Sequence, residues 1–441
     1  MSSRKEVLRP FEEKKDYMND RIAGGIEANR KGFAFVKLTD ENGEPVKNAE
    51  VKITQKTHDF KYGANLFMLD EIQDTEKNEQ YKRFFTDAFN LATLPFYWNT
   101  LEPEMGKPRY AKESPKIYRR PAPDLCLEFC EKNGIEAKAH CLNYAALMPE
   151  WAKGTVTWEK QCLEKRFREL AERYSMRIPM WEVTNETYWG GQLSTLYTQD
   201  DLVEWSFALA EKFFPANKLI INEAHSRVWS HEWFFHHNRS PYYMEIERAL
   251  LKGSRIDSIG MQFHMFHRRE NELQQTAVYY DPEQLYDVMD IYARLGKPLQ
   301  ITEITIPAYS NAAEDEEIQA QILRNLYSIW FSHPAMEAII YWNLPDGYGY
   351  NAAPGDMTAG ENYYHGGLVR FDFTPKPAYL AIRNLFEKEW RTNLTLHTDS
   401  GALSFKGFYG EYDLEITAGG QKVTRTIHLS KEKNRHFTVT L

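Results

Sequence analysis

The chain has 441 residues, enough for one large domain with a small accessory unit and for a sizeable buried core. Its formal net charge is -9, and this acidic balance argues against a nucleic acid or an anionic membrane surface as the partner. No apolar stretch approaches the roughly 18 residues that a membrane-spanning helix requires, so we expect no membrane partner. These features leave the oligomeric state open.

The first 31 residues have the pattern of a charged helix without the apolar core of a signal peptide. We therefore expect a cytoplasmic protein as the chain stands, or a secreted one if a signal has been removed. Residues 32–58 are predicted to be β structure. Two alternating segments within Gly32–Gln55, separated by the turn signal Asn42-Gly43, predict a half-buried hairpin.

Residues 391–441 have the same β character as residues 32–58. They contain five short alternating segments, separated by glycine-containing turns: LTLHTD, ALSFKGF, YDLEITA, KVTRTIHL and RHFTVTL. An isolated hairpin is only marginally stable, so we expect the two ends of the chain to form one small β-sandwich. This accessory domain either binds sugar or supports the main domain. Its alternating aromatics, Phe405 and Phe408, are typical of ordinary β packing and favour support.

Between these ends, residues 59–390 alternate apolar strands with amphipathic helices. The helix over 158–174 is the clearest, with Leu163, Phe167, Leu170 and Tyr174 at helical spacing. Eight strands in such an order predict an α/β fold, a closed (β/α)8 TIM barrel. The predicted strands are Tyr62–Phe67, Phe89–Phe96, Ile135–Leu142, Ile178–Val183, Leu219–Asn222, Ile256–His264, Pro298–Ile304 and Ala338–Trp342.

Polar residues lie at or near the C-terminal ends of most of these predicted strands, where barrels of this kind carry their chemistry. They are His140, Asn185, Glu186, Asn222, Glu223, Gln262, His264, Glu303 and Asn343. Such a coincidence across many strands is harder to explain by packing than any one polar residue alone. We therefore expect these side chains to meet at one mouth of the barrel.

Glu186 and Glu303 are the candidate catalytic pair. Glu186 ends the stretch MWEVTNE, and Glu303 interrupts the apolar stretch LQITEIT. A carboxylate on a buried strand is costly unless it is paired or hydrogen-bonded. Strands four and seven lie on opposite sides of a barrel mouth, so the two groups can flank a glycosidic bond, which is broken by one acid and one carboxylate. A salt bridge is the alternative for either residue alone.

Three neighbours are expected to bind substrate or to orient the pair. Asn185 can donate to a sugar hydroxyl if the backbone turns at the strand end. Gln262 and His264 alternate on one strand and therefore share a face, from which they can hold Glu303. For His264 and for His140, a satisfied histidine of the core is the alternative.

From about Lys61 to Phe386 the chain resembles glycoside hydrolase family 10, whose best-known members are endo-β-1,4-xylanases. The motifs that carry the resemblance are YWNTLEPEMGKPRY, AHCLNYAALMPEW, WEVTNE, INEA, GMQFH, ITEIT, YWNLPDG and FTPKPAYLAI. The resemblance implies Glu186 as general acid/base and Glu303 as nucleophile of a retaining mechanism. It also implies a xylan or xylo-oligosaccharide substrate. The residues that it places at the substrate are His140, Asn185, Gln262, His264, Trp98, Tyr97, Tyr144 and Trp342.

The chain departs from the family pattern along the wall that grips the sugar. Leu94 and Tyr97 stand where the family has Asn and Lys, and Tyr144 and Ala145 replace a Trp and a His. A decorated xylan or another β-glycoside therefore remains an alternative substrate, and a carbohydrate-binding barrel without catalysis remains an alternative function.

No cofactor and no metal are expected. The four cysteines, Cys126, Cys130, Cys141 and Cys162, lack the paired spacing of a zinc site. The remaining candidate residues fit acid–base chemistry without a metal ion.

Overall fold

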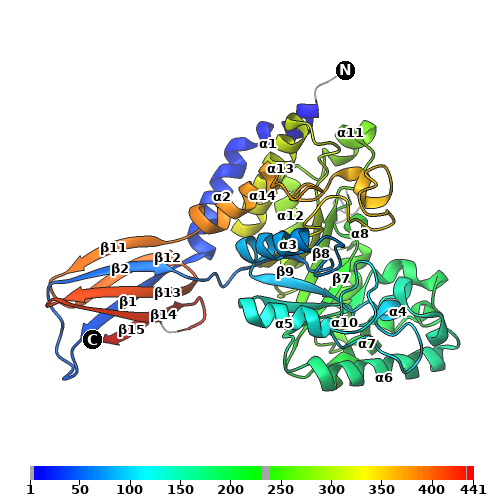
Figure 1. Cartoon of the computed structure of the whole chain (residues 1–441), viewed down its shortest axis with the longest axis horizontal. Coiled ribbons are helices and arrows are strands. Elements are labelled where there is room, and N and C mark those ends of the chain that lie inside the picture. The colour runs from blue at the N-terminus through cyan, green and yellow to red at the C-terminus, as the bar shows by residue number, and fades with distance from the viewer. Residues whose placement is uncertain (1–3, 231–238, 434) are drawn as a thin grey trace.

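The structure of the protein is a computed structural model that describes residues 4–230, 239–433 and 435–441. Figure 1 shows two parts, a large barrel surrounded by helices and a β-sandwich that projects from one side of it. The chain enters through helices that lie against the barrel, passes through the sandwich, builds the barrel and ends in the sandwich.

The predicted eight-stranded barrel is confirmed. Its parallel strands close in the order β10-β3-β4-β5-β6-β7-β8-β9. Their bounds are β3 Lys61–Asn65, β4 Leu91–Pro95, β5 Glu136–His140, β6 Met180–Asn185, β7 Lys218–Glu223, β8 Ser258–His264, β9 Leu299–Thr305 and β10 Met336–Tyr341. Nearly every residue of these strands is buried, as expected for a parallel sheet that side chains fill from within and helices cover from outside.

The helices outside the barrel follow the amphipathic stretches. Thr155 caps α6 by accepting from the Trp158 N–H, and the apolar stripe that ends at Tyr174 is buried. The main α-helices are α1 Arg9–Glu13, α2 Lys15–Asn29, α3 Thr75–Ala88, α4 Trp98–Leu101, α5 Pro123–Asn133, α6 Val156–Tyr174, α7 Leu202–Phe213, α8 His225–Val228, α10 Pro241–Leu251, α11 Glu272–Thr276, α12 Pro282–Ala293, α13 Ala313–Ser332 and α14 Pro377–Asn384.

The sandwich combines strands from both ends of the chain. One sheet has the order β12-β1-β15 and the other β11-β2-β13-β14. The bounds are β1 Lys31–Thr39, β2 Ala49–Gln55, β11 Asn393–Thr398, β12 Ala402–Phe408, β13 Gly410–Ala418, β14 Gln421–Leu429 and β15 His436–Thr440. Val36, Val51 and Leu414 are among the buried residues between the sheets.

The prediction that the segments within Gly32–Gln55 pair as a hairpin is wrong. A turn does form at Asn42-Gly43, where Gly43 has φ +83°, but β1 and β2 lie in different sheets. Each strand alternates buried and exposed residues, so each buries one face. Both strands bury their apolar faces in the same core because they lie in opposite sheets of the sandwich. Each of them pairs with strands from the C-terminal part of the chain instead of with the other.

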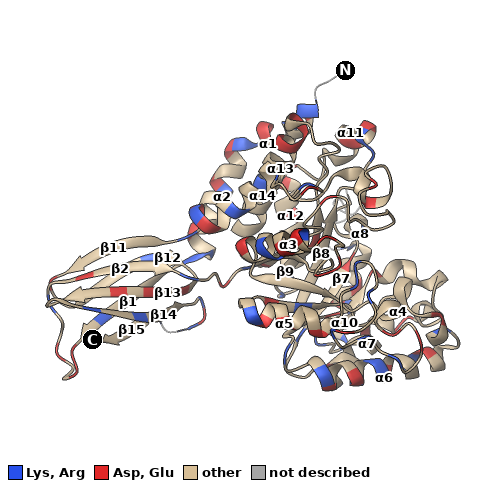
Figure 2. Cartoon of the chain, in the orientation of Figure 1, with Lys and Arg blue, Asp and Glu red and all other residues tan. Residues whose placement is uncertain are grey.

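The surface carries charges of both signs. Figure 2 shows acidic and basic residues interspersed along the outer helices, for example α2 and α6. Within the ranges that the structure describes, none of the helices combines the length and the apolar character needed to cross a membrane.

Candidate active site

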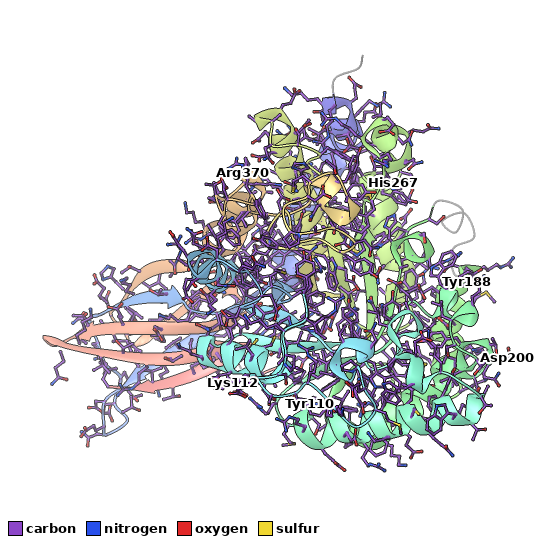
Figure 3. All side chains as sticks on the ribbon, turned by 45° about the vertical axis from the view of Figure 1, so that its right-hand side comes forward. Tyr110, Lys112, Tyr188, Asp200, His267 and Arg370 are labelled. Atoms are coloured by element: carbon purple, nitrogen blue, oxygen red, sulfur yellow. The ribbon has the colours of Figure 1, made fainter. Side chains whose placement is uncertain are left out.

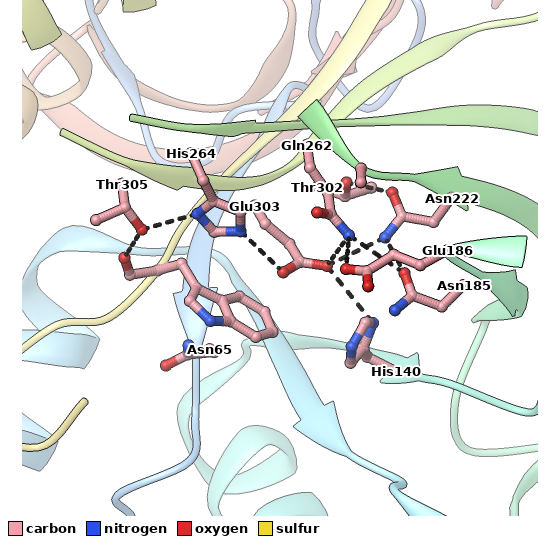
Figure 4. A network of polar contacts seen from close by, with 12 residues as sticks. Asn65, His140, Asn185, Glu186, Asn222, Gln262, His264, Thr302, Glu303 and Thr305 are labelled. Atoms are coloured by element: carbon pink, nitrogen blue, oxygen red, sulfur yellow. Dashed lines mark hydrogen bonds and ion pairs between the residues drawn. The ribbon is translucent and has the colours of Figure 1, made fainter. Parts of the chain in front are cut away.

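A cleft of about 420 Å³ opens at the C-terminal ends of the barrel strands. Its lining contains most of the residues predicted from the sequence: Tyr97, His140, Tyr144, Asn185, Glu186, Gln262, His264, Glu303 and Trp342. Figure 4 shows the polar side chains at its floor converging from several strands. Chain segments far apart in the sequence are therefore brought to one site by the closure of the barrel.

Asn185 and Glu186 both line the cleft although they are consecutive residues. Side chains alternate along a regular strand, but β6 ends at Asn185 and Glu186 has a left-handed backbone with φ 49°. This turn of the backbone brings both side chains to the same side, as expected. Glu186 accepts a hydrogen bond from the Tyr144 hydroxyl at 2.8 Å. Burial and the charge of Glu186 raise the pKa of Tyr144 far above its ordinary range, so the phenol remains a donor.

Glu303 is buried, with 5% of its surface exposed, and its two oxygens are held by three nitrogen atoms. Oε1 accepts from Asn222 Nδ2 and Gln262 Nε2, both at 3.1 Å, and Oε2 lies 3.2 Å from His264 Nε2. Thr302 donates to the side-chain oxygen Oδ1 of Asn222 at 2.5 Å and so turns the side-chain NH₂ of Asn222 toward Glu303. This arrangement satisfies a buried carboxylate and fixes the direction of its lone pairs.

Gln262 connects the two candidate catalytic carboxylates. Its Nε2 lies 3.0 Å from Glu186 Oε1 and 3.1 Å from Glu303 Oε1. These two oxygens cannot lie further apart than the two distances combined. This upper limit is shorter than the smallest separation between the two carboxyl groups of inverting glycosidases, ~6.5 Å.

Beneath the cleft lies a fully buried charge cluster of Glu182, Lys138 and His140. Lys138 Nζ donates to one oxygen of Glu182, and His140 Nδ1 bonds the other. Burial alone would raise the pKa of Glu182, but the two neighbours hold it at about 2. Burial alone would lower the pKa of His140, but Glu182 raises it. His140 is therefore fixed in place next to Glu303, with Nδ1 4.0 Å from Glu303 Oε1.

His140, Glu182 and Glu303 also form the one group of potential metal ligands found in the described part of the chain. The donor atoms of this group are already engaged by Lys138 and by one another. The ammonium group of Lys138 supplies the positive charge that a cation would provide, so the cluster is satisfied without a metal.

Trp98 is the predicted site residue that does not line the cleft. Its ring packs edge-on against Trp151, with 5.4 Å between centroids, and its Nε1 donates to Glu102 at 3.1 Å. It belongs to α4, whose preceding residue Tyr97 turns toward the cleft instead. The prediction that Trp98 contacts substrate is therefore not supported, and its observed role is to support the α4 segment.

Several residues of the site were missed in the sequence. The charges of Lys138 and Glu182, within apolar strands, are a signal that could have located the buried pair. Arg119 and Arg120 line the cleft from an irregular segment, where no periodic pattern marks them. Of the tyrosines in the loop after β10, Tyr350 lines the cleft.

Residues 57–385 match the family model described as glycosyl hydrolase family 10, and this is most of the chain. The chain therefore belongs to glycosyl hydrolase family 10. The comparison agrees with the barrel, the cleft and the two facing carboxylates described above.

Two curated relatives and one solved structure illustrate the similarity. Endo-1,4-beta-xylanase B from Thermotoga neapolitana is 26% identical over 350 residues, covering 75% of this chain and 88% of that protein. Anti-sigma-I factor RsgI6 from Acetivibrio thermocellus is 25% identical over 430 residues, covering 94% of this chain and 48% of that protein. Xylanase 10B from Thermotoga petrophila RKU-1, solved in complex with xylobiose, shares the fold with TM-score 0.60 at 22% identity, covering 75% of this chain and 95% of that chain.

The chain spans 48% of RsgI6, 38% of endo-1,4-beta-xylanase 1 and 34% of endo-1,4-beta-xylanase 2, the latter two from Arabidopsis thaliana.

Proposed function

We propose that the protein is a retaining glycoside hydrolase that cleaves β-1,4-xylosidic bonds in xylan or xylo-oligosaccharides. The observation that carries the proposal is the sharing of Gln262 Nε2 by Glu186 and Glu303. It keeps the two carboxylates closer than the separations at which a water molecule is accommodated between substrate and base in inverting enzymes. The family and the xylanase relatives support the choice of xylan.

In the first step Glu303 attacks the anomeric carbon while Glu186 gives its proton to the leaving oxygen. The glycosidic C–O bond breaks, the leaving sugar departs with the proton, and a glycosyl ester remains on Glu303. Asn222, Gln262 and His264 hold the attacking carboxylate in one orientation before the reaction.

In the second step Glu186 takes a proton from water, and the resulting oxygen attacks the same carbon. The ester bond to Glu303 breaks, and a sugar of retained configuration is released. Tyr144 donates to Glu186 Oε2 and keeps the carboxylate directed into the cleft during both steps. Asn185 lies beside the pair and accepts from Asn222 at 2.8 Å, which leaves its amide NH₂ free for a sugar hydroxyl.

A second candidate is the same chemistry on a decorated xylan or another β-glycoside. It is favoured by the aromatic wall formed by Tyr97, Tyr144 and Trp342, in which Tyr97 stands in place of the family's lysine and Tyr144 in place of a tryptophan. Such a wall selects its sugar through shape and stacking rather than through a lysine and an asparagine.

The product profile on β-1,4-xylo-oligosaccharides and matched gluco-oligosaccharides tests the proposal, with Glu303→Ala as the control. Release of short xylo-oligomers by the wild type alone is the expected result. Cleavage of the gluco series instead would support the second candidate. Tight binding of oligosaccharides by the folded wild type without any product would identify a binding barrel and contradict the proposed hydrolase.

A further inference from the structure

An irregular segment, residues 102–122, connects α4 to α5 and reaches the cleft with two consecutive arginines. Arg119 and Arg120 are both buried, with 3% and 8% of their surfaces exposed, and both line the cleft. The catalytic steps described above use neither of them. A buried guanidinium group needs a partner for its charge because removal from water is costly.

Arg119 has such partners. Its side chain donates to the backbone carbonyl of Tyr348 and to Asn343 Oδ1 at 3.1 Å, and it lies 3.8 Å from a carboxylate oxygen of Glu361. Its backbone is left-handed, with φ 62°, a conformation that a non-glycine residue keeps only when its surroundings hold it. Arg119 thus fastens the 102–122 segment to the loop after β10.

Arg120 is held differently. Its Nη1 donates to the Arg119 carbonyl at 2.8 Å, and its guanidinium carbon lies 4.2 Å from the centroid of the Tyr97 ring and 5.3 Å from that of Phe67. The proximity of these rings stabilises the cation but supplies no hydrogen-bond acceptor to its N–H groups. In the described part of the chain no carboxylate lies within ion-pair distance of Arg120.

Arg120 lies close to the proposed reacting groups, with the Tyr97 ring between them. The Tyr97 ring beneath it meets His140 edge-on, with 5.0 Å between centroids, and His140 lies 4.0 Å from Glu303. Arg120 is therefore separated from the residues around Glu303 by one aromatic ring. A sugar chain bound along the Tyr97 wall would present its substituents to Arg120.

Among the described residues of the cleft, no carboxylate forms an ion pair with Arg120, and Glu361 attracts it only from a longer distance. Glu361 is paired with Arg119 and also accepts from the Tyr350 N–H at 2.8 Å. Glu186 and Glu303 are engaged by Tyr144 and by amide donors. Burial lowers the pKa of Arg120 to about 10, so the side chain is still a cation at neutral pH.

We propose that Arg120 binds the carboxylate of a hexuronic acid residue carried by the substrate. A guanidinium edge matches a carboxylate with two parallel hydrogen bonds, and the charge assistance strengthens both. A neutral sugar would offer hydroxyl groups and leave the cation uncompensated. The inference rests on the proposed function in one respect, because it takes the ligand of the cleft to be a sugar chain.

The test compares xylo-oligosaccharides that carry one glucuronic acid branch with their methyl esters, the branch being placed at each backbone position in turn. The ester has nearly the same shape but no charge. For at least one position we expect kcat/KM to be about tenfold or more higher for the acid, an advantage that weakens at high salt. Arg120→Gln should abolish this preference, and Arg120→Lys should keep part of it because the charge remains. Arg425→Gln, exposed on β14, is the matched control and should leave the preference unchanged.

Affinity measured in the Glu303→Gln background separates this inference from the proposed function, because binding does not require turnover. Equal affinity for acid and ester at every position would overturn the inference, even if the wild type cleaves neutral xylan. A preference for the acid that disappears with Arg120→Gln would uphold it, even if the wild type cleaves nothing. An acid preference that survives Arg120→Gln in a folded variant would also overturn it.

Discussion

His264 Nε2 faces Glu303 Oε2 at 3.2 Å, and the opposite ring nitrogen determines which atom of this contact carries the proton. Nδ1 lies 2.9 Å from the Thr305 hydroxyl, whose single proton is donated to the Trp342 carbonyl at 2.5 Å. Nδ1 must therefore donate to Thr305. This hydrogen bond orients the imidazole ring and directs Nε2 at the Glu303 carboxylate, the group that we propose as the nucleophile.

Replacement of Thr305 by Val should weaken catalysis through His264. The variant removes the acceptor for Nδ1–H, so the imidazole ring is no longer held in the orientation that directs Nε2 at Glu303. We expect kcat/KM to fall about tenfold, because the Glu303 carboxylate loses a neighbour that fixes its orientation. Steady-state kinetics on xylo-oligosaccharides measures this loss. A folded variant with unchanged kcat/KM would contradict the positioning role of Thr305.

Glu186→Ala should affect substrates according to their leaving group. Without the acid, cleavage of unactivated xylo-oligosaccharides should fall by about 10²–10⁴-fold, because the leaving oxygen departs without its proton. Aryl xylosides with acidic phenols need little protonation and should keep much of their first-step rate. Glu303→Ala should abolish turnover of both classes, since it removes the attacking atom. Near-normal rates for Glu303→Ala would contradict the assignment of roles.

The buried carboxyl group of Glu223 predicts how stability changes with pH. Burial, with the nearby Glu245 adding to it, raises the pKa of Glu223 to about 8. In the unfolded chain the Glu223 carboxyl has an ordinary pKa, near 4. Its contribution to the free energy of unfolding is therefore fully present below pH 4 and is lost as the pH rises toward 8. Glu223→Gln cannot ionise, so it should gain about 1–3 kcal/mol relative to the wild type between pH 5 and pH 8.

Urea unfolding at pH 5 and at pH 8 measures this difference. Glu247→Gln, exposed on the same helix as Glu245, is the control and should change little with pH. If the difference in unfolding free energy between Glu223→Gln and the wild type is the same at both pH values, Glu223 is ionised in the native protein and the prediction is wrong.

Arg30 is expected to stabilise the connection between the sandwich and the barrel. It follows α2 and donates to the carbonyl groups of Phe331, in the last turn of α13, and of His333 and Met336, which follow that helix. Arg30→Met leaves these acceptors without their donor and should lower the free energy of unfolding by about 2–3 kcal/mol. Arg9→Met, which removes an exposed ion pair with Glu13, should cost less than about 1 kcal/mol in the same urea experiment.

The barrel could be predicted because apolar strands and amphipathic helices have different periodicities, so that their alternation along the chain is visible in the sequence. All eight predicted strands were found at the expected places. Glu186 and Glu303 could be predicted because a carboxylate near the end of an apolar strand is conspicuous. The prediction that β1 and β2 pair with each other was wrong, since a turn signal indicates that the chain reverses but not which sheet each strand joins. Their partners β12 and β11 lie in the C-terminal part of the chain, 339 to 377 residues further along the sequence.

The side chains of the cleft wall were predicted less completely than its floor. Tyr97 and Trp98 are consecutive, and a sequence motif cannot show which of them turns inward at the start of α4. The 102–122 segment has no periodicity, so nothing indicated that Arg119 and Arg120 reach the cleft. Tyr188, which follows Glu186 closely, is about half exposed and lies at the surface of the protein (Figure 3). The guanidinium carbon of Arg227 lies 3.6 Å from the centroid of its ring. Such contacts arise from loop conformation, which only the three-dimensional structure specifies.

The configuration of the first sugar released from a β-1,4-xylo-oligosaccharide tests the central mechanism most directly. Proton NMR during the first minutes of the reaction, before mutarotation mixes the anomers, distinguishes the two outcomes. The short distance between Glu186 and Glu303 predicts that the β-anomer appears first, because two displacements at the same carbon restore its configuration. Initial appearance of the α-anomer would mean a single displacement by water, and Glu303 could not then be the nucleophile.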